Sequence, residues 1–272
     1  MRNASSPSRS VMTRACSMDE ARCKMRPSLR MRAQCNSVYP TGQVGIQKKG
    51  LDQTLRTSRH HESIAQHMIT IVAIGDSTTA GTPGFRSPLE APPKGSGNVE
   101  SQYAHWLMTA HPDWRVLNRG VNGERSDQIR ARFTREAVQP GPDGVVIIAG
   151  VNDIYQGYDV EAVRSALEAM YAEARAANIP VVAGSIIPYN SASPEQNSRM
   201  HAVNDWIRSH AARSEGLVAF CDTRAAVAAP GQPDRLMSSP DDLHPSPDGY
   251  RLMASALEPV IRTVLAKAQA LR

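Results

Sequence analysis

A serine early in the chain and an aspartate–histidine pair near its end have the residue types of a nucleophilic catalytic site. Ser77 follows an apolar run, and Asp241 precedes His244 by three residues. Serine is a weak nucleophile unless a neighbouring base takes its proton and a third group orients that base. In a turn, this spacing lets the aspartate accept the Nδ1 proton, which leaves Nε2 as the base. The three residues therefore predict acyl transfer through Ser77, with His244 as base and Asp241 as its orienting group.

Each of these signals also has a purely structural interpretation. A serine after a strand often caps a helix or belongs to a phosphate-binding loop, and an Asp-x-x-His pair can be an ordinary surface turn. Asp242 is a rival for Asp241, but it lies only two residues before His244. Asp76 and Asp153 stand beside candidate site residues, and we expect both to brace loops rather than to do chemistry.

Acyl transfer also requires hydrogen-bond donors directed at the developing oxyanion, each worth roughly 10²–10³-fold in rate. Gly123 can expose its backbone N–H because glycine has no side chain in the way, and Asn152 offers a side-chain amide. The N–H of Ser77 itself is a third candidate. Gly120 is an alternative to Gly123, although we expect it to serve a tight turn. Ser77, Gly123 and Asn152 are therefore the predicted oxyanion hole.

A long segment, residues 82–98, directly follows the candidate nucleophile and is rich in proline and glycine. Loops of this length are usually functional or disordered. We expect Phe85 and Leu89 to form part of a substrate rim and to contact an acyl chain, with Tyr189 and Met237 bordering the same pocket. A solvated connector is the alternative interpretation of the segment.

Four short motifs resemble the sequence blocks of the SGNH/GDSL hydrolases, and they occur in the same order. They are GDST at 75–78, NRGVNG at 118–123, GVND at 150–153 and DDLHP at 241–245. The first block departs from G-D-S-L by one residue, which leaves the serine in place. Each motif alone is weak, whereas four in register are specific, and the resemblance covers residues 69–271.

The resemblance implies a flavodoxin-like fold and the same assignment of roles: Ser77 as nucleophile, His244 as base, Asp241 as orienter, and Ser77, Gly123 and Asn152 as oxyanion donors. It also implies a serine esterase that hydrolyses carboxylic esters, and we expect these to have short to medium acyl chains. A carbohydrate O-acetylesterase, a lysophospholipase or a thioesterase of the same family are alternatives, and a non-catalytic binding module is a further one. We expect a small ester as the partner.

No cofactor or metal is expected, because the predicted triad and oxyanion donors suffice for this chemistry and no H-E-x-x-H pattern occurs. The G-x-S-x-G elbow of ordinary α/β-hydrolases is also missing. Neither G-x-x-x-x-G-K-[ST] nor G-x-G-x-x-G follows the first predicted strand, so nucleotide binding has little support. The sequence therefore favours a serine hydrolase of a different architecture.

The elements that must position these residues alternate regularly from Met68 onward. Short apolar runs predict buried strands at 69–75, 115–118, 144–149, 180–186 and 217–221. Amphipathic stretches predict helices near 99–110, 125–136, 160–177, 194–213 and 247–270. This alternation is typical of a doubly wound α/β fold with a five-stranded parallel sheet flanked by helices. Ligands bind beyond the carboxyl ends of such strands, which is where the predicted site residues stand.

Charge is distributed unevenly along the 272 residues. Residues 1–67 hold 12 Lys/Arg and 4 Asp/Glu, whereas the remainder holds 19 and 22. The predicted hydrolase domain, residues 68–272, is therefore mildly acidic, and we expect no nucleic-acid partner.

Three cysteines, Cys16, Cys23 and Cys35, lie in the basic segment and Cys221 stands alone, which excludes a disulfide scaffold and disfavours a zinc site.

Residues 1–67 show no sustained helical or strand period and contain a single aromatic residue, Tyr39. Such a composition buries too little apolar surface to offset the entropy of ordering. We interpret this segment as a disordered or non-native extension, with translation starting near Met68; a native disordered tail and an organellar transit peptide are alternatives. No apolar run approaches the roughly 18 residues of a membrane span, and no secretory signal precedes the domain, so we expect a cytoplasmic protein.

Overall fold

The computed structural model describes residues 68–81, 98–214 and 216–270, all within one compact unit, Glu62–Arg272. The predicted extension at 1–67 and the predicted rim residues Phe85 and Leu89 lie outside the described residues. None of the described helices is long and apolar enough to span a membrane.

Five parallel strands form one sheet in the order β2-β1-β3-β4-β5. They are β1 (Ile69–Gly75), β2 (Trp114–Gly120), β3 (Gly144–Ile148), β4 (Val181–Gly184) and β5 (Val218–Cys221). The chain adds β2 on one side of β1 and then β3 on the other, so the winding direction reverses between β1 and β3. Such a switch point opens a crevice at the carboxyl ends of the strands. The predicted doubly wound sheet is confirmed.

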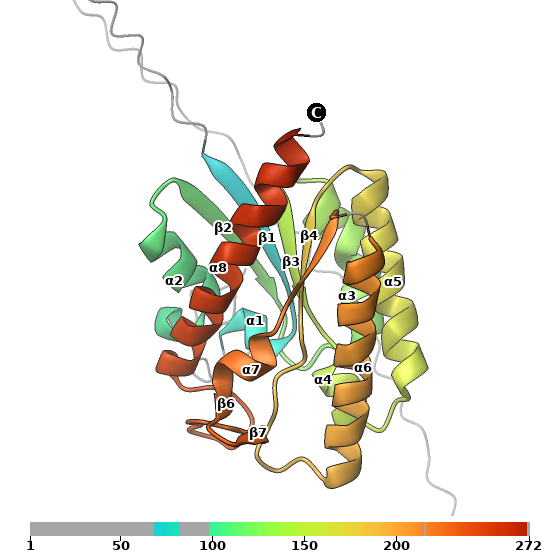
Figure 1. The fold of residues 1–272 in the computed structure, drawn as a ribbon, viewed down its shortest axis with the longest axis vertical. Helices are drawn as coiled ribbons and strands as arrows, with labels where there is room; N and C mark the ends of the chain where they lie inside the picture. The colour runs from blue at the N-terminus through green and yellow to red at the C-terminus, as the bar shows by residue number, and fades with distance from the viewer. Residues whose placement is uncertain (1–67, 82–97, 215, 271–272) are drawn as a thin grey trace, which may run out of the picture. The chain divides into compact units, whose positions relative to one another are not determined.

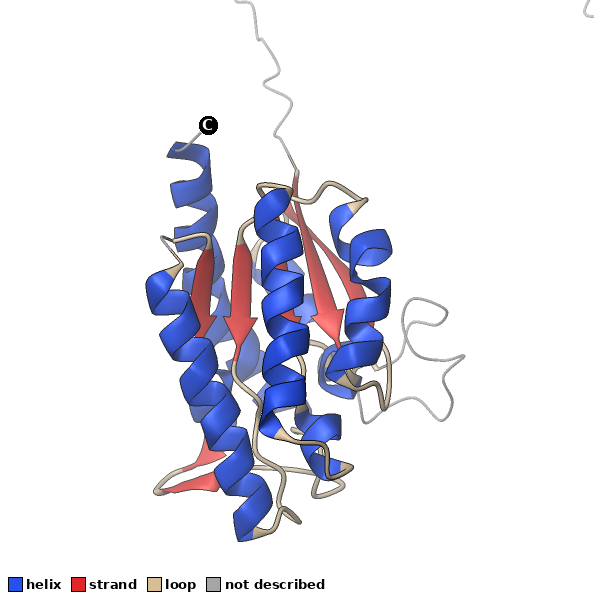
Figure 2. Cartoon of the chain, turned by 90° about the vertical axis from the view of Figure 1, so that its right-hand side faces the viewer, coloured by secondary structure: helices blue, strands red, loops and turns tan. Residues whose placement is uncertain are grey.

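Helices cover both faces of this sheet (Figures 1 and 2). One face carries α3 (Ser126–Phe133), α5 (Val160–Ala176) and α6 (Pro194–Arg213). The other carries α2 (Tyr103–Ala110) and α8 (Pro247–Ala270). Successive strand side chains point to opposite faces, and β1 shows the result. Val72 and Ile74 pack with α3, α5 and α6, whereas Ile71 and Ala73 pack with α2 and α8.

Capping residues explain where the longer helices begin. Ser193 accepts a hydrogen bond from the N–H of Gln196, whose side chain returns one to the Ser193 N–H, and Pro194 occupies the first turn of α6. This capping box satisfies backbone donors that a helix otherwise leaves free. Asp159 caps α5 through one hydrogen bond, which its Oδ1 accepts from the N–H of Ala162. Both helices therefore begin where their sequences predict.

Several short elements were not predicted. They are α1 (Ser77–Ala80), η1 (Val99–Ser101), the π-helix η2 (Thr134–Val138), α4 (Val151–Tyr155), α7 (Thr223–Val227) and the antiparallel pair β6 (Ala228–Ala229) and β7 (Gln232–Leu236). The predicted helix at 99–110 is interrupted at Gln102, and the one at 125–136 continues as η2. Helices α1, α4 and α7 begin just after β1, β3 and β5, so they build the edge of the sheet that holds the candidate site.

Candidate active site

Ser77, His244 and Asp241 meet at the carboxyl end of β1. His244 Nε2 lies 2.8 Å from Ser77 Oγ, and His244 Nδ1 lies 2.7 Å from Asp241 Oδ2. Ser77 and His244 are 5% and 6% exposed, whereas Asp241 is exposed. The fold therefore brings together two residues 167 positions apart in the chain. Both distances lie within the range over which an imidazole can take a hydroxyl proton and a carboxylate can orient the ring.

The turn that carries Ser77 is held by its neighbour Asp76. This residue caps α1, and its Oδ1 accepts a hydrogen bond from the N–H of Thr78 at 2.9 Å. The carboxyl group is only 1% exposed, and burial raises the pKa of Asp76 to about 7 despite the hydrogen bond from Thr78. Asp76 thus braces the turn from the protein interior, as its position before the serine suggested.

The loop that carries His244 is folded around Asp241. Besides the ring of His244, Asp241 accepts hydrogen bonds at Oδ1 from the backbone N–H groups of Leu243 at 3.0 Å and His244 at 2.7 Å. Burial acts to raise the pKa of Asp241, but these hydrogen bonds outweigh it and hold the pKa below its ordinary value. The carboxylate therefore stays ionised and fixes both the ring and the backbone of the histidine.

Asn190 connects this loop to the segment after β4. Its Nδ2 donates to Asp242 Oδ1 at 3.0 Å, its backbone N–H donates to Asp242 O at 2.8 Å, and its Oδ1 accepts from the N–H of Leu236 at 2.9 Å. Asp242 adopts a left-handed backbone, with φ of 59°. Its carboxylate is thus engaged with Asn190, and the carboxylate on the histidine ring is that of Asp241.

Gly123 and Gly120 differ in what their N–H groups do. The N–H of Gly120 donates to Asn118 Oδ1 at 2.9 Å, and a Cβ on Gly120 would lie 2.1 Å from the backbone nitrogen of Ala80. Gly123 has a φ of +79° and open space around the position of a Cβ, and its N–H meets no acceptor among the described residues. Of the two glycines, Gly123 has the N–H that is available to a ligand.

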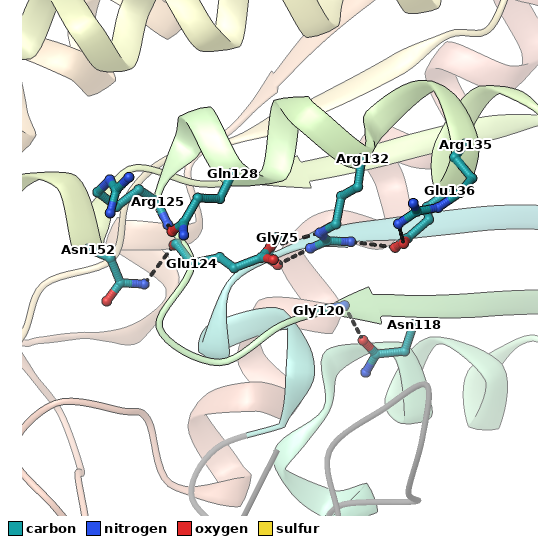
Figure 3. A network of polar contacts seen from close by, with 10 residues as sticks. All are labelled: Gly75, Asn118, Gly120, Glu124, Arg125, Gln128, Arg132, Arg135, Glu136 and Asn152. Atoms are coloured by element: carbon teal, nitrogen blue, oxygen red, sulfur yellow. Dashed lines mark hydrogen bonds and ion pairs between the residues drawn. The ribbon is translucent and has the colours of Figure 1, made fainter. Parts of the chain in front are cut away.

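Asn152 lies at the start of α4, and its amide is held by the loop after β2. One N–H of Nδ2 donates to the carbonyl oxygen of Glu124 at 2.9 Å (Figure 3). Because an amide nitrogen carries two hydrogens, a second N–H is left for a ligand. The backbone N–H of Ser77 also meets no acceptor among the residues that the structure describes. The three predicted donors thus follow the ends of three adjacent strands.

Asp153 ties α4 to the start of α3. Its Oδ2 accepts from the N–H of Ser126 at 2.9 Å and its Oδ1 from Ser126 Oγ at 2.7 Å, and the side chain is 2% exposed. Both carboxylate oxygens are therefore occupied at the helix N-terminus. Asp153 braces this loop, as expected from its place beside Asn152.

The predicted rim needs a correction at Tyr189. Met237 is 53% exposed, as a rim residue should be, but Tyr189 is 1% exposed and belongs to the core. The hydrogen bonds of Asn190 fix the backbone next to Tyr189. The Tyr189 ring packs edge-on against Tyr155, with ring centroids 6.0 Å apart. Tyr155 itself is 59% exposed, one helical turn after Asn152 on α4. The outer tyrosine of this pair, not the inner one, faces solvent.

Sequence reasoning also missed Glu124 and Arg132. The Arg132 side chain is buried and bonds Glu124 Oε2 at 2.7 Å, and Glu124 holds Asn152 through its carbonyl oxygen (Figure 3). A usable signal was present, because Arg132 lies between Ile129 and Phe133 on the buried face of α3. A charged residue on the apolar stripe of a helix requires a buried partner.

Comparisons with known proteins agree with this architecture. The sequence profile of the GDSL-like Lipase/Acylhydrolase family matches residues 73–252, an interval that holds Ser77, Gly123, Asn152, Asp241 and His244. An acetylxylan esterase from Geobacillus stearothermophilus is 28% identical over 170 residues, which cover 55% of this chain and 74% of that protein.

Two solved structures show the same fold. A member of the lipolytic protein G-D-S-L family from Veillonella parvula DSM 2008 superposes with a TM-score of 0.58 at 21% identity, over 71% of this chain and 98% of that one. A psychrotrophic esterase from Pseudoalteromonas sp., inhibited by monoethylphosphonate, superposes with a TM-score of 0.55 at 20% identity, over 72% and 98%.

Proposed function

This chain belongs to the GDSL-like lipase/acylhydrolase family and is a carboxylic ester hydrolase, and from that premise we propose that it acts through an acyl-enzyme on Ser77. One observation carries the proposal: the continuous pair of hydrogen bonds, 2.8 Å and 2.7 Å, from Ser77 through His244 to Asp241. A serine hydroxyl needs such a base and such an orienting carboxylate to become a nucleophile at neutral pH.

In the first half-reaction, Ser77 Oγ attacks the ester carbonyl carbon while His244 Nε2 takes the hydroxyl proton. Asp241 stabilises the imidazolium that forms and keeps Nδ1 protonated. The carbonyl oxygen becomes an oxyanion and accepts hydrogen bonds from the N–H groups of Ser77 and Gly123 and from Asn152 Nδ2. Collapse of this intermediate breaks the bond to the alcohol, which leaves with the proton from His244.

In the second half-reaction, water replaces the alcohol. His244 takes a proton from the water, whose oxygen attacks the acyl carbon, and the same donors stabilise the second oxyanion. Collapse breaks the bond to Ser77 Oγ, which recovers its proton from His244, and the carboxylic acid is released. Besides the ester and water, the cycle uses groups that this chain provides.

Replacement of the nucleophile tests this proposal. Ser77→Ala is expected to abolish turnover of p-nitrophenyl acetate and butyrate while the protein remains folded by circular dichroism. Ser255→Ala is the matched control, because Ser255 is exposed on α8 and, among the described residues, its Oγ bonds only the Arg251 carbonyl. Retained turnover in the Ser77 variant would overturn the proposal.

For the substrate, we propose esters of short to medium acyl chains. A carbohydrate O-acetylesterase is the second candidate, favoured by the likeness to an acetylxylan esterase. Tyr155, 59% exposed and three residues after Asn152 on α4, offers an aromatic ring to a bulky leaving group.

Two substrate series separate these candidates. The first series consists of p-nitrophenyl esters from acetate to palmitate, and the second of acetylated xylan and monosaccharide acetates. A preference for short synthetic chains with little acetate released from xylan supports the first candidate. A higher kcat/KM on acetylated sugars supports the second, and a maximum at long chains or on thioesters would contradict both.

A further inference from the structure

Arg132 is a buried guanidinium with three separate polar partners (Figure 3). Its side chain is 8% exposed. Nε donates to Glu124 Oε2 at 2.7 Å, one terminal nitrogen to Glu136 Oε2 at 2.6 Å, and the other to the carbonyl oxygen of Gly75 at 3.0 Å. A planar guanidinium holds its donors in a fixed arrangement. Arg132 therefore sets the relative positions of three backbone segments.

The bond to Gly75 reaches the end of β1, two residues before Ser77. The same carbonyl oxygen accepts the N–H of Val121 at 3.0 Å, so two donors occupy it. Val121 lies two residues before Gly123 in the loop after β2. The carbonyl group of Gly75 thus connects Arg132 both to the turn that carries Ser77 and to the loop that carries Gly123.

The bond to Glu124 reaches the residue that directly follows Gly123. The carboxylate of Glu124 is held by Arg132, and its carbonyl oxygen holds the amide of Asn152 at 2.9 Å. A single chain of hydrogen bonds therefore runs from Gly75 through Arg132 and Glu124 to Asn152. It touches all three segments from which the proposed oxyanion donors come.

Charges within this cluster are balanced. Arg132 and Arg135 face Glu124 and Glu136, and Arg135 donates to Glu136 Oε1 at 2.6 Å. Burial acts to raise the pKa of Glu136, but the bonds from Arg135 and Arg132 outweigh it and hold the pKa below its ordinary value. Glu136 belongs to η2, a π-helical turn directly after α3. The guanidinium is therefore anchored from its far side by an ionised carboxylate.

We propose that Arg132 and Glu124 are positioning residues that set the spacing of the oxyanion donors of Ser77, Gly123 and Asn152. The inference rests on the proposed function, because it assigns a role to residues around that site. These donors follow three different strands, and they stabilise an oxyanion only at about 2.7–3.1 Å from it. A misplacement of about 1 Å can cost about 10²-fold in rate, so a brace across the strands has a direct catalytic effect.

The test uses the full chain, four single variants and the Arg132→Met/Glu124→Ala double variant. Arg132→Met removes all the hydrogen-bond donors while keeping a side chain of similar length. Arg132→Lys keeps the positive charge but loses the planar guanidinium that bonds three acceptors. Glu124→Ala removes the carboxylate while leaving the carbonyl that holds Asn152. Arg130→Met, two residues earlier on an exposed position of α3, is the matched control. Each is assayed for kcat and KM on p-nitrophenyl acetate, for melting temperature, and for the dissociation constant of an alkylboronic acid.

An alkylboronic acid forms a tetrahedral adduct with a reactive serine, so its affinity reports the oxyanion hole without turnover. In Arg132→Met we expect kcat to fall about 10–10²-fold with KM nearly unchanged, and boronic acid binding to weaken by the same factor. Arg132→Lys should lose less, because one donor group remains. The Arg132→Met/Glu124→Ala double variant should lose no more than the larger single loss, since both act through one chain. Arg130→Met should match the wild type.

A merely structural role predicts a different pattern. The melting temperature would fall, while kcat and boronic acid affinity, measured well below it, would equal those of the wild type, and the inference would be overturned. Losses that add up in the double variant would overturn it as well. If Arg132→Met does not fold, Arg132→Lys and Glu124→Ala decide by the same readouts. A wild type that neither hydrolyses the ester nor binds the boronic acid contradicts the proposed function instead.

Discussion

At the scale of single residues, two aspartates beside the site have different roles: Asp241 contacts His244, and Asp76 precedes Ser77. Asp241 is exposed, and the hydrogen bonds it accepts hold its pKa low. Asp76 is buried, and one of its carboxylate oxygens, Oδ2, has no hydrogen-bond partner among the described residues. The first is suited to stabilise a cation on the histidine, and the second makes the stability of the fold depend on pH.

The sign of that dependence follows from the raised pKa of Asp76, about 7 in the folded protein against 3.8 for the free side chain. Below pH 3.8 both states hold the proton, and there is no penalty. As pH rises toward 7, the unfolded chain loses the proton while the folded protein keeps it, so stability falls. Above pH 7 the penalty is constant.

Asp76→Asn removes this penalty and retains the oxygen that caps Thr78. We expect the variant to gain stability over the wild type as pH rises from 4 to 7, by up to about 4 kcal/mol. Urea unfolding of both proteins across this pH range measures the difference. A difference that does not change with pH would contradict the burial of an ionisable carboxyl at this position.

Part of the site was predictable from the sequence at this scale because it is local, whereas the contact between Ser77 and His244 joins residues 167 positions apart and was expected only from the four motifs in register. Asp241 and His244 lie within one turn, and Ser77 directly follows a strand. The contacts of Arg132 with Gly75 and Glu124 could not be derived, because they depend on how α3 packs against the end of β1. The exposure of Tyr155 and the burial of Tyr189 likewise depend on tertiary packing.

At the scale of elements, the site depends on how closely β2 approaches α1. A Cβ on Gly120 would lie 2.1 Å from the nitrogen and 2.5 Å from the Cα of Ala80, both backbone atoms that cannot move aside like a side chain. Ala80 belongs to the same four-residue helix as Ser77. The close approach of these two elements therefore positions the nucleophile.

Gly120→Ala should consequently lower the free energy of unfolding by several kcal/mol, and the fraction of the variant that folds should have a lower kcat. Gly157→Ala is the matched control: a Cβ there meets open space, and only its φ of +85° opposes the change. That strain costs about 1–2 kcal/mol. Thermal unfolding of both variants checks the contrast, and equal small losses would show that the approach is not tight.

The long elements were predicted well and the short ones were not. Helices α6 and α8 have the predicted bounds, because each shows several turns of periodicity after a clear start signal, a serine followed by a proline. Helices α1, α4 and α7 are four or five residues long, which is too short for a 3.6-residue period to appear. These short helices lie at the edge of the sheet that holds the site. The sequence therefore predicted the sheet and its long helices better than the short elements around the site.

At the scale of the whole molecule, every described element that positions the site lies between Ile69 and Ala270. We propose that residues 68–272 form the hydrolase domain and that residues 1–67 are not needed for its fold. A chain that starts at Met68 should fold with an unchanged melting temperature and keep kcat/KM within about twofold of the full-length protein. Differential scanning calorimetry and ester hydrolysis of the two proteins, side by side, check this. An aggregated or inactive shorter chain would show that residues 1–67 contribute to the fold.

Covalent labelling followed by mass spectrometry tests whether His244 activates Ser77 as a nucleophile. A fluorophosphonate should modify the tryptic peptide of residues 60–86 at Ser77, with the rate of labelling reduced about 10²-fold or more in His244→Ala. Modification of a different residue, or labelling of Ser77 at the same rate without the imidazole, would contradict the account of a serine activated across the edge of the sheet.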